Sequence, residues 1–308
     1  MAPVNRNDPI RATTSESRYS LMEFMRDYPD DATCLDWLWR TRYSDDGIHA
    51  DCPKCDRQRA FKKYATAQSR QSWTCTACGH HIQPTAGTIF HKSSTSLHLW
   101  FYAMYLMTST RCGISAKQLE REIGCTYKTA WRMLHLIRHE LMSDDSEPLR
   151  GHVEIDEMYV GGKRRGMLGV PKLQGKQPVL GMVERKGRVI ATTVENASRA
   201  ALMPHVEKYV LPESVVYTDE WKSYRQLGKN GYQHKRIQHK ENIYVSGSVH
   251  TNTIEGFWSL VKRGLDGVYH SVSAKHLQGY LDEYAWRYNH REDGRAQFDA
   301  LIERAAQA

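Results

Sequence analysis

The sequence lacks any hydrophobic run long enough to cross a membrane, and its opening residues lack the apolar centre of a signal peptide. Its most apolar segment, residues 97–107, is too short to span a bilayer and contains His98. Internal repeats and low-complexity tracts are missing as well. We therefore expect a cytoplasmic protein without a membrane partner, in a compartment where disulfide bonds are rare.

The charge is only moderately one-sided, and the hydrophobic content is ordinary. Lys and Arg number 43 against 35 Asp and Glu, a formal net charge of +8, and 40% of the 308 residues are hydrophobic. This composition excludes bulk disorder, allows about two or three domains, and weakly favours a polyanionic partner. Residues 52–92 hold seven basic residues and one acid, and residues 160–192 hold eight and one. Such stretches indicate either two anion-binding surfaces or ordinary solvated faces.

Four of the seven cysteines have the spacing of metal ligands. Cys52 and Cys55 form one pair, and Cys75 and Cys78 form a second pair after nineteen intervening residues. A two-residue gap lets a tight turn aim both sulfurs at one ion, so the four thiolates can surround one tetrahedral zinc. Four protein ligands leave no position for water, which predicts one structural Zn²⁺ in a zinc ribbon rather than a set of structural or redox thiols. The other cysteines are expected to be buried: Cys34, Cys112 and Cys125.

Zinc ribbons bind DNA, RNA or proteins, and this one would present basic side chains to such a partner. Two short helices, 20–28 and 32–42, are predicted ahead of it. The candidate DNA contacts on the ribbon are Arg57, Lys62 and Lys63.

Residues 113–138 have the pattern of a helix-turn-helix. Ser115 and Thr126 can each cap a helix, and Gly124 permits the turn between the two helices. The second helix would read the major groove of DNA, although an ordinary helical pair packed on a neighbour remains the alternative. Its expected exposed residues are Tyr127, Lys128, Arg132 and Arg138, with Lys128 and Arg132 as DNA contacts.

From residue 152 onward the pattern changes to strands. Three strands (152–160, 177–184 and 188–194) are followed by a helix, a strand at 214–218, a helix at 221–227, a strand at 232–239 and further helices. This order is that of an RNase H-like domain. It predicts an α/β fold with a mixed five-stranded sheet and flanking helices, preceded by the zinc ribbon and the helix-turn-helix.

Acidic residues occupy distinctive places in this order. Asp156 lies in the first strand, Asp219 ends the fourth, and Glu255 opens the helix that follows the fifth. Three carboxylates from separate elements can converge on two divalent cations, and Mg²⁺ prefers such oxygen ligands. The alternative for each acid alone is a solvated surface position, which is least satisfactory for Asp156 in a buried strand. Nearby acids that could be confused with them are Glu154, Glu157 and Glu220.

These residues carry a resemblance to a known family. Asp219 and Glu255 are separated by 35 residues, and Lys262 follows Glu255 by seven. The pattern resembles the Asp-Asp-Glu signature of RNase H-like transposases and integrases, and residues 52–292 resemble bacterial insertion-sequence transposases with an N-terminal zinc ribbon. Some relatives place Asn third, which makes Asn252 an alternative to Glu255. The supporting phrases are IDEMYVGGK (155–163), YTDEW (217–221), NTIEGFWSLVK (252–262) and YNHR (288–291).

The resemblance implies a transposase that binds the terminal inverted repeats of its element and catalyses metal-dependent DNA strand cleavage and strand transfer. Asp156, Asp219 and Glu255 would hold two Mg²⁺ or Mn²⁺ ions. Double-stranded DNA would be the partner, and a dimer or larger homo-oligomer would assemble on it at the bacterial nucleoid. Two other functions fit the residues: a DNA-binding regulator with an inactive RNase H-like domain, and a metal-dependent nuclease without strand transfer.

The expected domains are an N-terminal helical segment (1–51), the zinc ribbon (52–92), the helix-turn-helix region (93–142), the catalytic domain (150–295) and a C-terminal helix (296–308). A basic loop follows the first catalytic strand, where glycines permit close approach to a DNA backbone. Trp221, His250 and Trp258 could line the site, although aromatic residues there are more often core. The candidate DNA contacts in this domain are Lys163, Arg164, Arg165, Lys172, Lys176 and Lys262.

Overall fold

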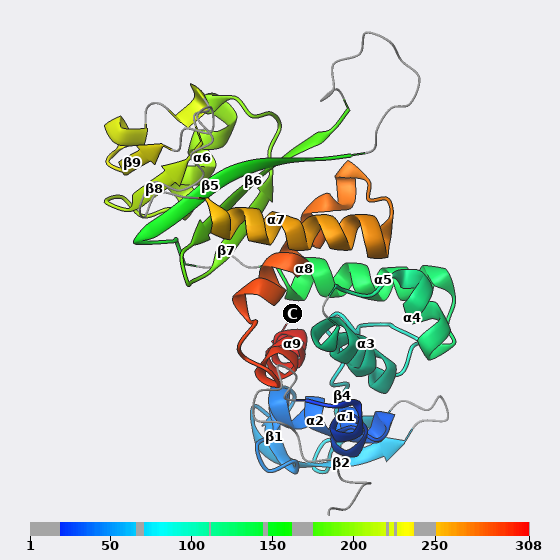
Figure 1. The fold of residues 1–308 in the computed structure, drawn as a ribbon. Helices are drawn as coiled ribbons and strands as arrows, with labels where there is room; N and C mark the ends of the chain where they lie inside the picture. Colours follow the sequence, from blue (N-terminus) through cyan, green and yellow to red (C-terminus); the bar gives the residue numbers. More distant parts are fainter. Residues whose placement is uncertain are drawn as a thin grey trace, which may run out of the picture. The chain divides into compact units, whose positions relative to one another are not determined.

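The computed structural model describes residues 19–65, 71–110, 112–143, 147–161, 175–219, 222–224, 227–236 and 251–307. The chain divides into two compact units (Figure 1), one of residues 1–111 with 290–308 and the other of residues 112–289. Within the described ranges, no helix is both long and apolar enough to cross a membrane. The predicted basic loop contacts Lys163, Arg164, Arg165 and Lys172 lie outside the described residues, as do Glu220, Trp221 and His250.

The first unit joins a small antiparallel sheet to four helices, and it contains the two N-terminal helices predicted from the sequence. The sheet has the strand order β1-β2-β3-β4. Its strands are β1 (His49–Cys52), β2 (Arg57–Ala65), β3 (Gln71–Cys75) and β4 (His81–Ile82). The helices are α1 (Leu21–Asp27), α2 (Asp31–Tyr43), α3 (Leu97–Ser109) and α9 (Ala296–Gln307).

Aromatic side chains form the core of this unit. The Trp39 ring of α2 stacks on Trp73 of β3 with ring centroids 5.0 Å apart, so the helix covers the small sheet. Phe298 of α9 lies 5.8 Å from Phe24 of α1 and 6.4 Å from Phe101 of α3. The end of the chain therefore completes the core of the N-terminal unit, because α9 places the buried ring of Phe298 against aromatic rings of α1 and α3.

The second unit contains a mixed five-stranded sheet, which confirms the predicted α/β class. The sheet has the order β7-β6-β5-β8-β9, with β5, β6 and β7 antiparallel and with β8 and β9 parallel to β5. Its strands are β5 (His152–Val160), β6 (Gln177–Glu184), β7 (Val189–Thr193), β8 (Val215–Thr218) and β9 (Gln233–Arg236). The helices are α4 (Ala116–Ile123), α5 (Tyr127–Leu136), α6 (Arg199–Tyr209), α7 (Asn252–Gly264) and α8 (Leu277–Asn289).

Helices bury both faces of this sheet. On one face Ile155 of β5 packs in a core with Leu202 and Val206 of α6. On the other face Met158 of β5 packs in a second core with Phe257 of α7 and Leu281 of α8. Because alternate residues of a strand point to opposite faces, β5 sends its odd-numbered side chains toward α6 and its even-numbered ones toward α7.

One predicted helix differs from the structure. The sequence predicted a helix over 221–227, but the described residues there form a 3₁₀ turn, Lys222–Tyr224, and a second 3₁₀ segment, Leu227–Asn230. Tyr224 and Leu227 are fully buried in the core on the α6 side, so each of the two described 3₁₀ segments places a side chain in that core.

The predicted pair of helices at 113–138 is present with its predicted caps. Ser115 accepts a hydrogen bond from the Gln118 backbone, and Thr126 accepts one from the Thr129 backbone. Gly124 between them has φ +65°, the left-handed conformation that ends α4 and that glycine adopts without strain. The polar turn residues therefore fix both helix ends as the sequence indicated.

The prediction that Arg138 is exposed on this pair is wrong. α5 passes into a π-helical segment, Ile137–Leu141, and the Arg138 side chain is 4% exposed there. Its Nε donates to Oε2 of the fully buried Glu283 at 2.7 Å, and Tyr280 covers its guanidinium at 4.2 Å. Arg287 also donates to Glu283, so two guanidinium groups hold the pKa of this carboxyl below its usual range in spite of burial. A buried ion pair thus fastens α5 to α8.

Candidate active site and zinc cluster

Strand register brings Asp156 and Asp219 together. β5 and β8 are parallel, with His152 opposite Val215 and Glu154 opposite Tyr217. Continuing this register by two residues places Asp156 opposite Asp219, which directly follows β8. Two acids that are distant in sequence therefore lie near each other where β8 ends beside the middle of β5, and the carboxyl end of a parallel strand is a usual place for a site in an α/β sheet.

The third acid, Glu255, is brought in by the start of α7, and Glu154 fixes that start. Oε2 of Glu154 accepts hydrogen bonds from the backbone N–H groups of Thr253 and Ile254, at 2.8 and 3.0 Å. Oε1 accepts from Arg185 Nε at 2.7 Å. A buried carboxylate at the positive end of α7 satisfies amides that have no partner within the helix. Glu154, two residues before Asp156, thereby holds the Glu255 helix against the Asp156 strand.

Replacing Glu154 with Ala is expected to lower the free energy of unfolding by about 3–5 kcal/mol, because Arg185 and two helix-end amides lose a buried charged partner. The matched control is Glu195→Ala, an exposed acid of the same unit, which should change stability by less than about 0.5 kcal/mol. Urea unfolding of both variants measures the difference. Equal effects would contradict the stabilising role of the Glu154 hydrogen bonds at the start of α7.

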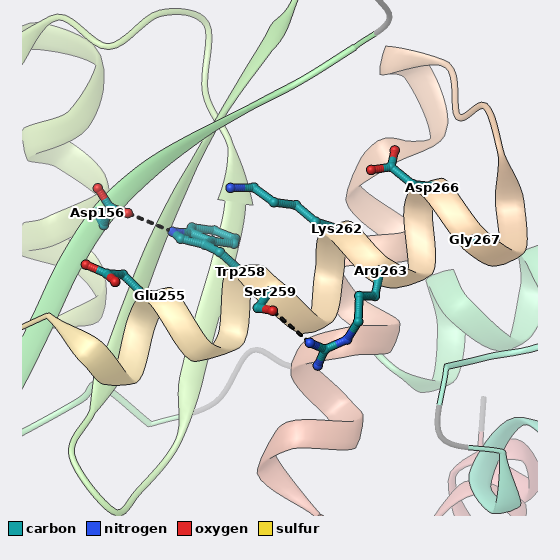
Figure 2. Close-up of a pocket in the computed structure, with 8 residues that line it drawn as sticks. All are labelled: Asp156, Glu255, Trp258, Ser259, Lys262, Arg263, Asp266 and Gly267. Atoms are coloured by element: carbon teal, nitrogen blue, oxygen red, sulfur yellow. Dashed lines mark hydrogen bonds between the residues drawn. The ribbon is translucent and has the colours of Figure 1, made fainter.

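Asp156 and Glu255 border a pocket on the α7 side of the sheet, and Asp219 is not part of its lining. Figure 2 shows Asp156 from β5 and Glu255 from α7 facing the same space, with Lys262 extending along α7 toward Trp258. The pocket has a volume of about 820 Å³. Glu255, Ser259 and Lys262 all line it, so these residues, spaced i, i+4 and i+7, share one face of α7. Asn252, the alternative third acid position, begins α7 and is absent from the lining.

Burial and mutual repulsion dominate the electrostatics of this site. Burial, followed by the charges of Asp219 and Glu255, raises the pKa of Asp156 to about 6. The indole N–H of Trp258 opposes this rise by donating to Asp156 Oδ2 at 3.1 Å. Three acids in one place thus carry an excess of negative charge that a bound cation would relieve.

A fourth acid, Glu157, lies next to this group but points to the opposite face of β5. Tyr224, which is fully buried, donates its hydroxyl to Glu157 Oε1 at 2.6 Å. Burial, then the charges of Asp219 and Asp156, raise the pKa of Glu157 to about 7. The sequence placed Glu157 among the acids that could be confused with the triad, and the alternation of β5 separates it from Asp156.

Trp258 reaches Asp156 because β6 has a glycine opposite that strand position. Gly181 pairs with Asp156 across β5 and β6. A Cβ atom on Gly181 would lie 2.3 Å from Trp258 Cζ2 and 2.9 Å from Ile254 Cδ1. The bare backbone therefore admits the indole between the sheet and α7. Trp258 is 3% exposed and also lines the pocket, so it serves both core and site.

Gly181→Ala is expected to displace the indole and lower the free energy of unfolding by about 1–3 kcal/mol. The hydrogen bond to Asp156 should be lost with it. Gly256→Ala on α7 is the control, because a Cβ there meets nothing within 4 Å, and replacing a helical glycine should stabilise by up to about 1 kcal/mol. Thermal unfolding and tryptophan fluorescence of both variants test this. A stable Gly181→Ala protein with unchanged fluorescence would contradict the packing argument.

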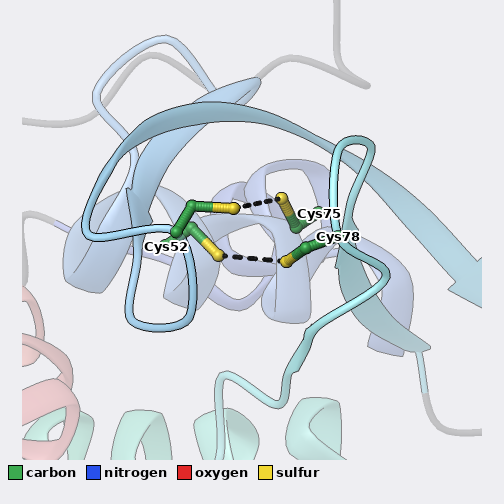
Figure 3. Close-up of side chains that lie close together, drawn as sticks. Cys52, Cys75 and Cys78 are labelled. Carbon is green, nitrogen blue, oxygen red and sulfur yellow. Dashed lines mark hydrogen bonds between the residues drawn. The ribbon is translucent and has the colours of Figure 1, made fainter.

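The four paired cysteines converge in the first unit (Figure 3). Their sulfur atoms all lie within 4.8 Å of one another, with Cys52 and Cys78 3.6 Å apart and Cys55 and Cys75 4.0 Å apart. Four thiolates at about 2.3 Å from one zinc would be about 3.8 Å apart, so the cluster fits this ion. Gly79, next to the last ligand, has φ +72° and closes the second turn.

The remaining cysteines only partly follow the prediction. Cys34 is buried, whereas Cys125 is half-buried and Cys112 is exposed, so the expectation of burial is wrong for both. The Cys112 carbonyl accepts a hydrogen bond from the Tyr284 hydroxyl at 2.8 Å, which turns its backbone inward and leaves the thiol outside.

The described candidates for DNA contact lie on exposed or half-buried surfaces. The ammonium group of Lys63 forms an ion pair with Asp36 at 2.9 Å, so part of its charge is already neutralised within the protein. Lys176 is half-buried at the start of β6, beside Gly161. The others are exposed: Arg57, Lys62, Lys128, Arg132 and Lys262.

Fold and site together define an α/β protein with acids in the middle of β5, after β8 and in the first turn of α7, and with a separate four-cysteine cluster. Residues 148–289, which contain the acids, match the ISXO2-like transposase domain family. A protein of the transposable element ISH50 of Halobacterium salinarum is 30% identical over 274 residues, covering 82% of this chain and 90% of that protein. The chain therefore belongs to the ISXO2-like family of insertion-sequence transposases.

Two further comparisons are more limited. A transposase-like protein of Haemophilus influenzae is 34% identical over 107 residues, which are 35% of this chain and 85% of that protein. A cryo-EM structure of a simian T-cell lymphotropic virus intasome with the PP2A regulatory subunit B56 gamma gives a TM-score of 0.30 at 13% identity, covering 59% of this chain and 65% of that one. A TM-score this low does not establish a common fold.

Proposed function

We propose that the chain catalyses DNA strand cleavage and strand transfer at an RNase H-like site in which Asp156, Asp219 and Glu255 act together. The observation that carries the proposal is the parallel register of β5 and β8, which, continued by two residues, would bring Asp156 beside Asp219; the charge of Asp219 acting on Asp156 supports it. Glu154 adds the third acid by fixing the start of α7. Family membership supports transposition over the other reactions open to such a site.

The donor set suits two Mg²⁺ or Mn²⁺ ions. Carboxylate oxygens are the ligands that these hard cations prefer. Burial first, and then the charges of Asp219 and Glu255, raise the pKa of Asp156, and bound cations would offset those charges. When bound, such ions supply a Lewis acid for the nucleophile and for the departing 3′ oxygen of an in-line displacement. The chain contributes the fixed carboxylates, the Trp258 indole that orients Asp156, and Lys262 for the phosphate backbone.

DNA recognition would use α4 and α5 as a helix-turn-helix and the cysteine cluster as a zinc ribbon. Lys128 and Arg132 are exposed on α5, the helix that would enter the major groove. Arg57 and Lys62 are exposed on β2, a strand of the small sheet in the first unit, which also holds the four cysteines. These contacts would bind the terminal inverted repeats, and two DNA ends would be paired by a dimer or larger assembly at the nucleoid.

The test is an in vitro strand-transfer assay with the element's own ends, supercoiled target DNA and Mg²⁺. Joined products that disappear in EDTA are expected. Cleavage without joined products would identify a nuclease instead, and end-binding without any cleavage would identify a DNA-binding regulator.

A further inference from the structure

Three histidines that have no part in the proposed reaction converge in the second unit. His135 lies on α5, His139 lies on the π-helical segment Ile137–Leu141, and His276 ends the 3₁₀ turn Ala274–His276 that leads into α8. Each offers a ring nitrogen, and these nitrogens all lie within 4.8 Å of one another. The fold thus gathers imidazoles from two segments that are far apart in sequence.

Packing holds the three rings in place. The Trp131 ring stacks on His135 with centroids 4.8 Å apart and meets His276 edge-on at 5.2 Å. His135 and His139 lie 4.3 Å apart, one π-distorted turn of helix from each other. Gly279 of α8 makes room for the His139 ring, since a Cβ there would lie 2.7 Å from His139 Nε2. The three rings therefore converge because Trp131 packs against two of them and because Gly279 has no side chain to displace the third.

The ring nitrogens are available as ligands. All three histidines are half-buried, and across the described ranges none of their rings forms a hydrogen bond with another residue. Burial, followed by the neighbouring histidines, lowers the pKa of His135 below its usual range, and burial and His276 do the same for His139. Neutral imidazole is the form that binds metals, so little energy is needed to remove protons on binding.

We propose that His135, His139 and His276 bind one divalent transition-metal ion of the zinc type, with water completing its coordination. Nitrogen ligands favour Zn²⁺, Ni²⁺ or Cu²⁺ over Mg²⁺, which separates this site from the carboxylate site. Three imidazoles at about 2.0–2.1 Å from zinc would have nitrogens about 3.4 Å apart, and the nitrogens already lie within 4.8 Å of one another, so binding requires only small shifts of the packed rings. The ion would tie the second helix of the α4–α5 pair to the start of α8.

The site also differs from the cysteine cluster in a measurable way. Four thiolates close the coordination of their ion, whereas three imidazoles leave a position open to solvent. Its metal should therefore exchange faster and absorb differently when cobalt replaces zinc. The site does not depend on the proposed transposition, because its metal content can be measured whatever the strand-transfer assay gives.

Zinc content of the full-length, tag-free chain tests the proposal. After equilibration with Zn²⁺ and removal of unbound ion by gel filtration, the wild type should hold about two zinc ions per chain, and His139→Gln or His276→Gln about one. The matched control is His205→Gln, a half-buried histidine of α6 whose ring stacks on Tyr209, and it should keep both ions. If the wild type held about one zinc ion per chain, or if neither His139→Gln nor His276→Gln lost an ion, the three histidines would not bind zinc and their contacts would be aromatic packing only.

Cobalt spectra make the result independent of small folding defects. Co²⁺ in the cysteine cluster gives an intense thiolate charge-transfer band, whereas Co²⁺ on three imidazoles gives only weak visible bands. Titration of the wild type should show both, and His139→Gln should lose the weak bands while the thiolate band keeps its intensity. Weak bands that persist in His139→Gln would overturn the assignment.

Discussion

Asp156→Asn is expected to reduce DNA strand cleavage and strand transfer by about a thousand-fold or more, while binding of element ends stays close to that of the wild type. The substitution keeps the shape of the side chain and its place next to Trp258, but it removes the charge that would hold a cation. Asp219→Asn should act in the same way, because the strand register sets these two residues opposite each other. Strand-transfer rates in Mg²⁺, with end-binding measured by gel shift, give both quantities.

Two neighbouring substitutions serve as controls for this prediction. Glu157→Gln changes an acid adjacent to Asp156 that faces Tyr224 on the other side of β5, so it should retain far more activity than Asp156→Asn. Glu255→Ala should be inactive and Asn252→Ala active, because the charge of Glu255 acts on Asp156. If Glu157→Gln were inactive and Asp156→Asn active, Glu157 would be the catalytic acid. If Asn252→Ala were inactive and Glu255→Ala active, Asn252 would be the third catalytic residue. Full cleavage by Asp156→Asn would exclude the proposed site.

Much of the architecture was predictable because it depends on local signals. Ser115, Gly124 and Thr126 mark helix ends through short-range hydrogen bonds and a left-handed turn, and the structure has each of them in place. The two cysteine pairs were equally plain, since a four-thiolate cluster requires only two tight turns. The mixed five-stranded sheet followed from strands alternating with helices.

The supports of the candidate site were not predictable, because they depend on contacts across the sheet. Nothing near Glu154 in sequence shows that it accepts the amides at the start of α7. The two-residue spacing of Glu154 and Asp156 places both on one face of the strand, and this spacing alone made Glu154 an alternative to Asp156 as a metal ligand. Gly181 offered a weak signal, a glycine inside an apolar strand, which often marks close approach of another group.

Arg138 illustrates the same limit for surface predictions. Helical spacing placed it on the exposed side of α5, but the helix widens into a π-turn at that point and Glu283 on α8 offers a buried carboxylate. A change of helical geometry and a partner 145 residues away are both invisible to a periodicity count. The three converging histidines escaped notice for the same reason, since His276 comes from a distant segment.

Cys55→Ser is expected to remove the zinc ion of the cysteine cluster and to unfold much of the β1–β4 sheet. Structural zinc contributes an apparent 10–16 kcal/mol, about the scale known for small zinc modules, so losing one of four thiolates is severe. Among the described residues, the large apolar side chains that the sheet buries are Phe61, Trp73 and Ile82, and Trp39 of α2 packs on the first two. Zinc content should fall by about one ion per chain, and the small unit should become sensitive to protease.

The exposed Cys112 supplies the control, because Cys112→Ser removes a thiol outside the cluster and should leave zinc content and folding unchanged. The decisive readout is the thiolate-to-cobalt band, since a site made of imidazoles cannot produce it. If Cys55→Ser kept that band at full intensity, the four cysteines would not share one ion. If the band were lost but the sheet stayed folded, packing of Trp73 on Trp39 would be sufficient to hold the strands, and the ion would serve the surface that the cluster presents rather than the fold itself.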